Sequence, residues 1–296
     1  IERLSRVVGN RVQVTGAYNE SRYAASIELR SFKEFKDNDI TIMARGTGGC
    51  RNTTAYFYFY DGEVMQDNTF RTNYNTCDNR QSRVNLHARS DRPFHVTGNY
   101  FSAPGTNYSN VYVELRGDVR FKDNVVLAPG GIASYAQPNT AEIRNNLVLA
   151  AKTQFHNANE SRGVYVGESS LVSVVNNTLI ADPIHGRSGF GIKVEGNARP
   201  KILNNHIQGY TEGIVLNSEP GEVLFNNITD VTNRFSGSVS IPYIGQLSTV
   251  NHLGTPSDIY YNTATDPGFL DTFDFQYKAF DGVVEEILAG TFTSPY

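Results

Sequence analysis

The heptapeptide Ile143-Arg144-Asn145-Asn146-Leu147-Val148-Leu149 contains the pattern that decides the fold: a short apolar strand, an asparagine and a second apolar strand. An apolar strand that ends in asparagine recurs nine times, at intervals of roughly 22 to 31 residues, a period typical of solenoids. Equivalent residues of adjacent coils lie roughly 4.8 Å apart, so asparagine amides in register can hydrogen-bond along the stack. We therefore interpret the repeated asparagines as structural; they are Asn10, Asn38, Asn68, Asn99, Asn124, Asn146, Asn177, Asn205 and Asn227.

A third strand, with alternating inward and outward residues, lies upstream of most of these asparagines. Phe57-Tyr58-Phe59 and Ile192-Lys193-Val194 are examples. Three strands per coil and weak helical periodicity predict an all-β fold, a single-stranded right-handed parallel β-helix (solenoid) with an Asn ladder and about nine coils. A β-sandwich is the main rival, but it would not keep asparagine at one phase through nine repeats. We assign residues 1–237 to the coils, and residues 238–296 to the last coil and an irregular C-terminal cap of the same domain.

Charge and cysteine content limit the function classes and indicate the compartment. The net charge of −4 and the pI near 5.9 argue against a general nucleic-acid binder, and no apolar run is long enough to predict a membrane span. Ile1 falls inside a repeat, so we expect an upstream signal segment to be absent from this chain and the protein to be secreted or periplasmic in a bacterium. Cys50 and Cys77 occupy similar loop positions in neighbouring coils, which suits a disulfide, although two independent thiols would fit as well.

The outward residues of the third strand form the candidate site. When Leu86 is aligned with Phe57 and Val113, the columns of outward residues concentrate Tyr, His and Arg in coils two to five. Aromatic rings suit the apolar faces of sugars, and Arg89 and Arg116 side by side suit a carboxylate or sulfate. This pattern predicts a groove that binds an acidic polysaccharide or oligosaccharide, unless Tyr and Arg only cover the pleat. The residues assigned to substrate binding are Tyr56, Asn85, Tyr112, Tyr135, Tyr165 and Lys193.

Three activities suit such a face. Cleavage of a uronate-containing glycan by β-elimination, the main hypothesis, makes the chain a polysaccharide lyase and needs a neutraliser, a base and an acid. Glycoside hydrolysis is the runner-up, with Asp91 and Asp118 as the acid pair. Non-catalytic carbohydrate binding, as in adhesin-like or tail-fibre-like β-helices, is the third. The residues assigned to catalysis are His87, Arg89, Glu114, Arg116, Tyr58 and Tyr60.

Two further expectations concern the electrostatics of this cluster. Glu114 is expected to orient His87 or raise its pKa. The sequence makes no cofactor certain and leaves open whether a metal is needed, but Ca²⁺ is a candidate because Glu114, Asp91 and Asp118 are expected to cluster. The oligomeric state is left open.

The later coils resemble known repeats. Gly191-Ile192-Lys193-Val194, followed by Leu203-Asn204-Asn205, is similar to the parallel β-helix repeats of the pectate-lyase-like superfamily, which implies the fold and leaves the activity open. Arg162-Gly163-Val164-Tyr165, leading to Asn176-Asn177, resembles a coil of the alginate and chondroitin lyases of polysaccharide lyase family six. Those enzymes use a Lys base and an Arg acid, the latter in an Arg-His-Gly motif. This chain has no such motif, so no catalytic residue is carried over from the resemblance.

Overall fold

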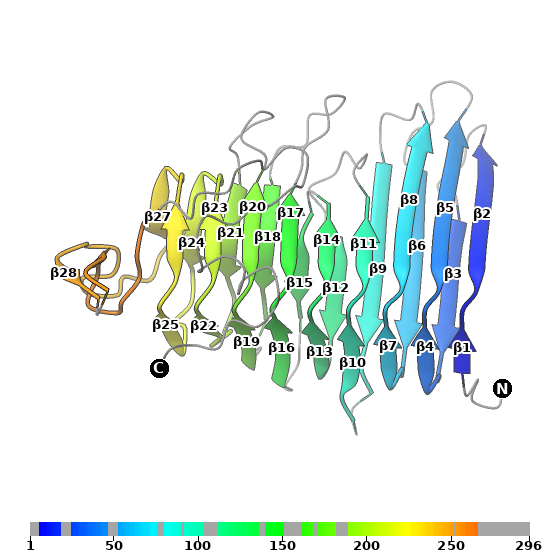
Figure 1. Cartoon of the computed structure of the whole chain (residues 1–296), viewed down its shortest axis with the longest axis horizontal. Helices are drawn as coiled ribbons and strands as arrows, with labels where there is room; N and C mark the ends of the chain where they lie inside the picture. The colour runs from blue at the N-terminus through cyan, green and yellow to red at the C-terminus, as the bar shows by residue number, and fades with distance from the viewer. Residues whose placement is uncertain are drawn as a thin grey trace.

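The computed structural model confirms a parallel β-helix. It describes residues 6–18, 25–46, 53–75, 80–89, 92–103, 112–128, 130–135, 140–150, 161–168, 171–181, 189–251 and 253–265. Three nine-stranded parallel sheets run along a right-handed solenoid, and each coil contributes one strand to each sheet (Figure 1). Within these ranges no helix is long and apolar enough to cross a membrane.

We name the sheets A, B and C in the order in which each coil visits them. Sheet A contains β1 (Arg6–Val8), β4 (Glu34–Lys36), β7 (Val64–Gln66), β10 (Phe94–Thr97), β13 (Val119–Lys122), β16 (Thr140–Arg144), β19 (Leu171–Val175), β22 (Lys201–Leu203) and β25 (Glu222–Leu224). Sheet B contains β2 (Arg11–Tyr18), β5 (Asp39–Gly46), β8 (Thr69–Asn75), β11 (Tyr100–Ser102), β14 (Val125–Leu127), β17 (Leu147–Ala150), β20 (Thr178–Ala181), β23 (His206–Gln208) and β26 (Asn227–Thr229). Sheet C contains β3 (Ala25–Arg30), β6 (Thr53–Tyr60), β9 (Arg80–His87), β12 (Val113–Arg116), β15 (Ile132–Ser134), β18 (Ser161–Val166), β21 (Gly189–Val194), β24 (Glu212–Leu216) and β27 (Asn233–Ser236). After them, β28 (Thr249–Val250) and β29 (Pro256–Ser257) form a small antiparallel pair.

A residue in the left-handed conformation separates sheet A from sheet B in most coils. Gly98 and Asp123 have φ of 69° and 55°, a conformation that Gly, Asp and Asn adopt most readily. In the last coil Phe225 takes this position, with φ of 59°. Asn226 therefore joins the ladder, and the assignment of Asn227 to that role is wrong by one residue, because the Asn226-Asn227 doublet also matches the pattern one step later.

The asparagine ladder satisfies buried polar groups at the A–B corner. The backbone N and the side-chain Nδ2 of Asn99 both donate to Asn124 Oδ1, at 2.9 and 3.0 Å, and Nδ2 also donates to the carbonyl of Met65 at 3.1 Å. The same arrangement repeats from Asn10 to Asn226. Asn262 accepts from Asn226 in the same way and adds a rung that our reading of the sequence missed, although Ile259-Tyr260-Tyr261 precedes it and Tyr261 has the left-handed conformation with φ of 61°.

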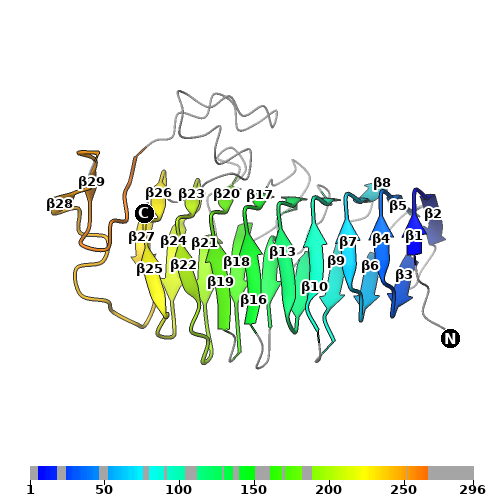
Figure 2. The same ribbon diagram turned by 60° about the horizontal axis from the view of Figure 1, so that its bottom comes forward.

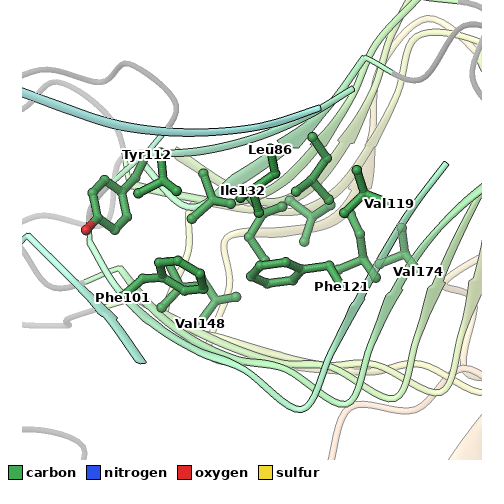
Figure 3. Packing of buried hydrophobic residues seen from close by; sticks show 14 of the residues in the cluster. Leu86, Phe101, Tyr112, Val119, Phe121, Ile132, Val148 and Val174 are labelled. Carbon is green, nitrogen blue, oxygen red and sulfur yellow. The ribbon is translucent and has the colours of Figure 1, made fainter. Parts of the chain in front are cut away.

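Apolar side chains fill the inside of the coils. The rings of Phe70 and Phe101 stack at 5.0 Å between centroids, and those of Phe101 and Phe121 at 5.7 Å. Tyr112 lies in this core as well, among the buried side chains that include Phe101 (Figure 3). The prediction that Tyr112 faces outward to bind substrate is wrong, because it precedes β12 and its ring turns inward where the chain enters the strand.

Candidate functional site

The outer face of sheet C carries the candidate site, across the adjacent strands β6, β9 and β12 (Figure 1). Tyr60 lies opposite His87, which lies opposite Arg116. Two residues earlier on each strand, Asn85 lies between Tyr58 and Glu114. Five of the six residues assigned to catalysis are therefore on one surface, and Arg89 is the exception.

The predicted register of β9 is wrong by two residues. Val84, not Leu86, pairs with Phe57 and Val113, so Leu86 pairs with Phe59. Both registers point apolar residues inward, because strand side chains alternate with a period of two. The predicted register would have placed Ala88 beside Phe59, the position that Leu86 occupies in the structure. Leu buries more apolar area than Ala, which favours the observed pairing.

The shift changes which arginines belong to the site. Arg89 is exposed beyond the end of β9 and does not lie opposite Arg116. Arg83 joins the face instead, since it is outward on β9 beside Glu114. Sequence reasoning missed Arg83, although aligning Val84 and Leu86 with Phe57 and Phe59 would have found it.

A row of tyrosines forms the apolar part of the face. Along β6, the Tyr56 and Tyr58 rings are 5.3 Å apart, and the Tyr58 and Tyr60 rings are 6.0 Å apart and nearly parallel at 5°. The Tyr60 ring meets the edge of His87 at 4.6 Å. The three rings are half-buried, so each keeps an exposed part on which a flat apolar ligand surface can rest.

A buried carboxylate holds the basic part of the face together. Glu114 is 4% exposed; its Oε1 lies 2.5 Å from Arg116 Nε and its Oε2 lies 3.2 Å from Arg83 Nη1. Burial of a carboxylate requires such pairing. The negative charge of Glu114 thus balances one of the two guanidinium charges. The Arg116 guanidinium also lies over the ring of Tyr135, 5.7 Å from its centroid.

The surroundings of His87 disfavour its charged form. Its pKa is lowered from 6.5, first by burial and next by the Arg116 guanidinium, which outweigh the opposing effects of Glu114 and Asp61. Glu114 does act to raise the pKa of His87, as expected, but burial and Arg116 have larger effects, so the net shift is downward. The carboxylate of Glu114 is held by Arg116 and Arg83, so a guanidinium lies beside the imidazole together with the carboxylate.

A second polar group continues the face toward the later coils. Tyr165 donates from its hydroxyl to Glu195 Oε2 at 2.8 Å, and Lys193 Nζ lies 2.6 Å from Glu195 Oε1. The hydrogen bond from Lys193 lowers the pKa of Glu195, and burial raises the pKa of Tyr165 above its usual range. Tyr135 connects the two groups, since its ring lies 5.6 Å from that of Tyr165. Lys193 is thus already paired with a carboxylate.

The remaining predicted site residues are Asn85, Asp118 and three that the structure does not describe. Asn85 faces outward but is buried beneath its neighbours. Asp118 forms an ion pair with Arg120 at 2.8 Å. Asp91, Cys50 and Cys77 fall outside the described residues, so the acid pair and the disulfide stay predictions.

A model of a protein family matches this chain. The family model described as "Periplasmic copper-binding protein (NosD)" matches residues 34–263, most of the chain. No curated protein and no solved structure matches the chain. The family description confirms the predicted secreted or periplasmic location. It contradicts the main hypothesis of a polysaccharide lyase, because it describes a binding protein.

The described residues do not fit a copper site. Copper in proteins prefers thiolate, thioether and imidazole ligands held together. The described part of the chain has no cluster of three His, Cys, Asp or Glu residues that could hold a metal. Met65 is fully buried in the core, and the Met43 sulfur, on β5, accepts a hydrogen bond from Gln13 Nε2 at 3.9 Å. His87 has the cationic Arg116 as its strand neighbour, which disfavours a second cation. The same finding leaves the Ca²⁺ expectation without support, since Glu114 is paired with arginines.

Proposed function

Because this chain belongs to the NosD family, whose description names a periplasmic copper-binding protein and no enzyme, we propose that it is a non-catalytic β-helix, and that it binds an acidic polysaccharide on the outer face of sheet C. The observation that carries the proposal is the row Tyr56, Tyr58 and Tyr60. Three half-buried rings spaced 5.3 and 6.0 Å apart form an extended apolar strip on a rigid sheet. Sugar rings present apolar C–H faces that stack on such a strip and polar edges that bind the groups beside it.

The charges beside the tyrosines favour an anionic sugar. Glu28 pairs with Arg30, and Glu195 pairs with Lys193, so these two groups are close to neutral. Arg83 and Arg116 share Glu114, so two guanidiniums and one buried carboxylate lie beside the aromatic strip. The Arg116 side chain is half exposed and its remaining N–H groups suit a carboxylate or sulfate.

Copper binding, which the family description names, does not follow from the described residues. The site on sheet C instead contains aromatic rings and ion pairs, which recognise organic polyanions better than soft metal ions.

Binding of defined oligosaccharides tests the proposal. We would titrate the full chain by calorimetry with carboxylated, sulfated and neutral oligosaccharides of equal length. We expect the acidic series to bind, no release of reducing ends and no unsaturated product. Tyr58→Ala and Arg116→Ala should each weaken binding by about tenfold, the loss expected for one stacking ring or one charge-assisted contact.

Two control substitutions away from sheet C test whether a loss of affinity is specific to its outer face. Tyr243→Ala removes a ring that is 61% exposed after the last coil, and Arg144→Ala removes an outward guanidinium of sheet A. Neither should change the affinity. Equal losses in the control variants, or binding that is unchanged in both face variants, would show that sheet C is not the binding surface.

A further inference from the structure

Asn85 lies in the middle of the aromatic and basic part of sheet C. β9 lies beside β6 in that sheet (Figure 2), and Asn85 pairs with Tyr58 on β6 and with Glu114 on β12. Its chain neighbours Val84 and Leu86 are fully buried in the core, so the Asn85 side chain points to the outer face. The residue is nevertheless only 4% exposed, so it forms the floor of this face.

The amide of Asn85 lacks the hydrogen bonds that a buried amide requires. Among the described residues, no acceptor lies within hydrogen-bond distance of Asn85 Nδ2. Its strand neighbour Glu114 directs one carboxylate oxygen to Arg116 and the other to Arg83. A buried donor without an acceptor is unfavourable, and most buried polar groups of native proteins are hydrogen-bonded. The missing acceptor therefore points to a bound partner.

The asparagines of the ladder show the contrast. Asn68 Nδ2 donates to Asn99 Oδ1 and to the carbonyl of Phe35, both at 2.9 Å. Asn68 is 1% exposed, so it is buried to a similar extent as Asn85 and differs from it in hydrogen bonding. The ladder amide is satisfied by the coils themselves, whereas the amide of Asn85 has an unused donor on the face where we place the ligand.

We propose that Asn85 is a specificity-determining residue of sheet C, and that it binds a free ring hydroxyl of the acidic sugar that stacks on Tyr58. Adjacent strands lie about 4.8 Å apart, so the edge of a sugar ring on Tyr58 reaches over β9. A hydroxyl accepts from Asn85 Nδ2 and can donate to the amide oxygen, whereas an O-acetylated oxygen is bulkier and has no proton to donate. The inference rests on the proposed function, since the same sugar makes both contacts.

Two arginines control access to this amide. Arg83 precedes Asn85 by two residues on β9 and Arg116 follows Glu114 by two on β12, so a guanidinium approaches Glu114 from each side. The side chains of Arg83 and Arg116 are 34% and 51% exposed, and exposed side chains change rotamer rapidly. The anionic group of the sugar binds the other N–H groups of these guanidiniums and draws them outward, and a hydroxyl beside that group then meets Asn85.

Calorimetry with the full chain tests this role of Asn85. The probes are carboxylated and sulfated hexasaccharides with free ring hydroxyls, and the same compounds after O-acetylation. The unsubstituted chain should bind the free forms at least about tenfold more tightly. Asn85→Leu keeps the size of the side chain and removes the amide, so it should weaken binding of the free forms by about tenfold and abolish the preference.

Thermal unfolding separates a role in binding from a role in folding. Asn85→Leu removes a donor that has no acceptor, so its melting temperature should equal or exceed that of the unsubstituted chain. Asn68→Leu is the matched control, because it removes the bonds to Asn99 and Phe35 and should lower the melting temperature by several degrees. If Asn85→Leu lowers it as much as Asn68→Leu, Asn85 is structural and the inference is wrong.

The binding results also separate this inference from the proposed function. If acidic hexasaccharides bind and Tyr58→Ala weakens them, but the unsubstituted chain shows no preference or Asn85→Leu retains it, only the role of Asn85 is wrong. If no acidic hexasaccharide binds, or if Tyr58→Ala leaves the affinity unchanged, the proposed function fails and this inference fails with it.

Discussion

The asparagine ladder gives the sharpest stability prediction, and Asn124→Ala is the perturbation that tests it. Asn124 accepts at Oδ1 from Asn99 N and Nδ2, and its own Nδ2 donates to Val96 O at 2.9 Å and Asn146 Oδ1 at 3.2 Å. After the substitution, Asn99 Nδ2 keeps its bond to Met65 O and Asn146 Oδ1 keeps its bond from the backbone of residue 124. The backbone N–H of Asn99 loses its acceptor, and the carbonyl of Val96 loses the side-chain donor of residue 124. Both losses occur in a buried site.

The expected loss follows from these groups. A buried polar group left without a partner costs about 1 to 3 kcal/mol, so Asn124→Ala should lower the free energy of unfolding by about 3 kcal/mol. Asn10→Ala is the matched control, because Asn10 is exposed in the first coil and the backbone N–H of residue 10 still donates to Asn38 Oδ1. Its loss should stay below about 1 kcal/mol.

Urea unfolding followed by circular dichroism measures both values, provided that the slope with denaturant is unchanged. The amide proton of Asn99 should also exchange faster in Asn124→Ala, which gives a local readout. If the two variants lose the same stability, or if exchange at Asn99 is unaffected, the ladder does not work by satisfying buried donors, and our reasoning is refuted.

Three further predictions concern His87, Gly191 on β21 and copper. The pKa of His87 is lower in the folded than in the unfolded chain, so the unfolded state binds more protons below pH 6.5 and the free energy of unfolding should fall as the pH drops through that range. An NMR titration should show that the pKa of His87 rises in Arg116→Ala. A pKa at or above 6.5 in the unsubstituted chain would contradict the assigned burial. Gly191→Ala would place a Cβ 2.3 Å from Ile207 Cγ2 and 2.8 Å from Gly213 O, so it should lower the free energy of unfolding by about 1 to 3 kcal/mol. In the control Gly221→Ala the atoms nearest to the new Cβ lie at 3.4 Å, so the loss of stability should be far smaller. Equal melting temperatures of the two variants would count against the close approach at Gly191. Copper added to the full chain should leave the ring resonances of His87 and His206 unchanged, and broadening of either would place a copper ligand among the described residues.

The sequence was sufficient for the fold class because the repeat is redundant. Apolar strands that end in asparagine recur at a nearly constant spacing, so an error in one coil is corrected by the others. The error at Asn227 shows the limit, since a doublet of asparagines matches the pattern in two ways and the left-handed Phe225 decides between them. The type of residue on sheet C was also predictable, because tyrosines that alternate with phenylalanines in β6 must face outward.

The composition of the site depended on register, which the tertiary structure decided. A shift of two residues keeps the same side chains inward and outward. The hydrophobic pattern therefore gives only a weak preference for Val84 over Leu86 as the residue that pairs with Phe57. That shift removes Arg89 from the site, brings in Arg83 and places Glu114 between two guanidiniums. The sequence by itself determined that the chain is a solenoid with an asparagine ladder and an aromatic outer face. Packing between coils determined which charges meet, because side-chain neighbours in a solenoid come from residues about 30 positions apart and their pairing depends on how each coil fills the shared core.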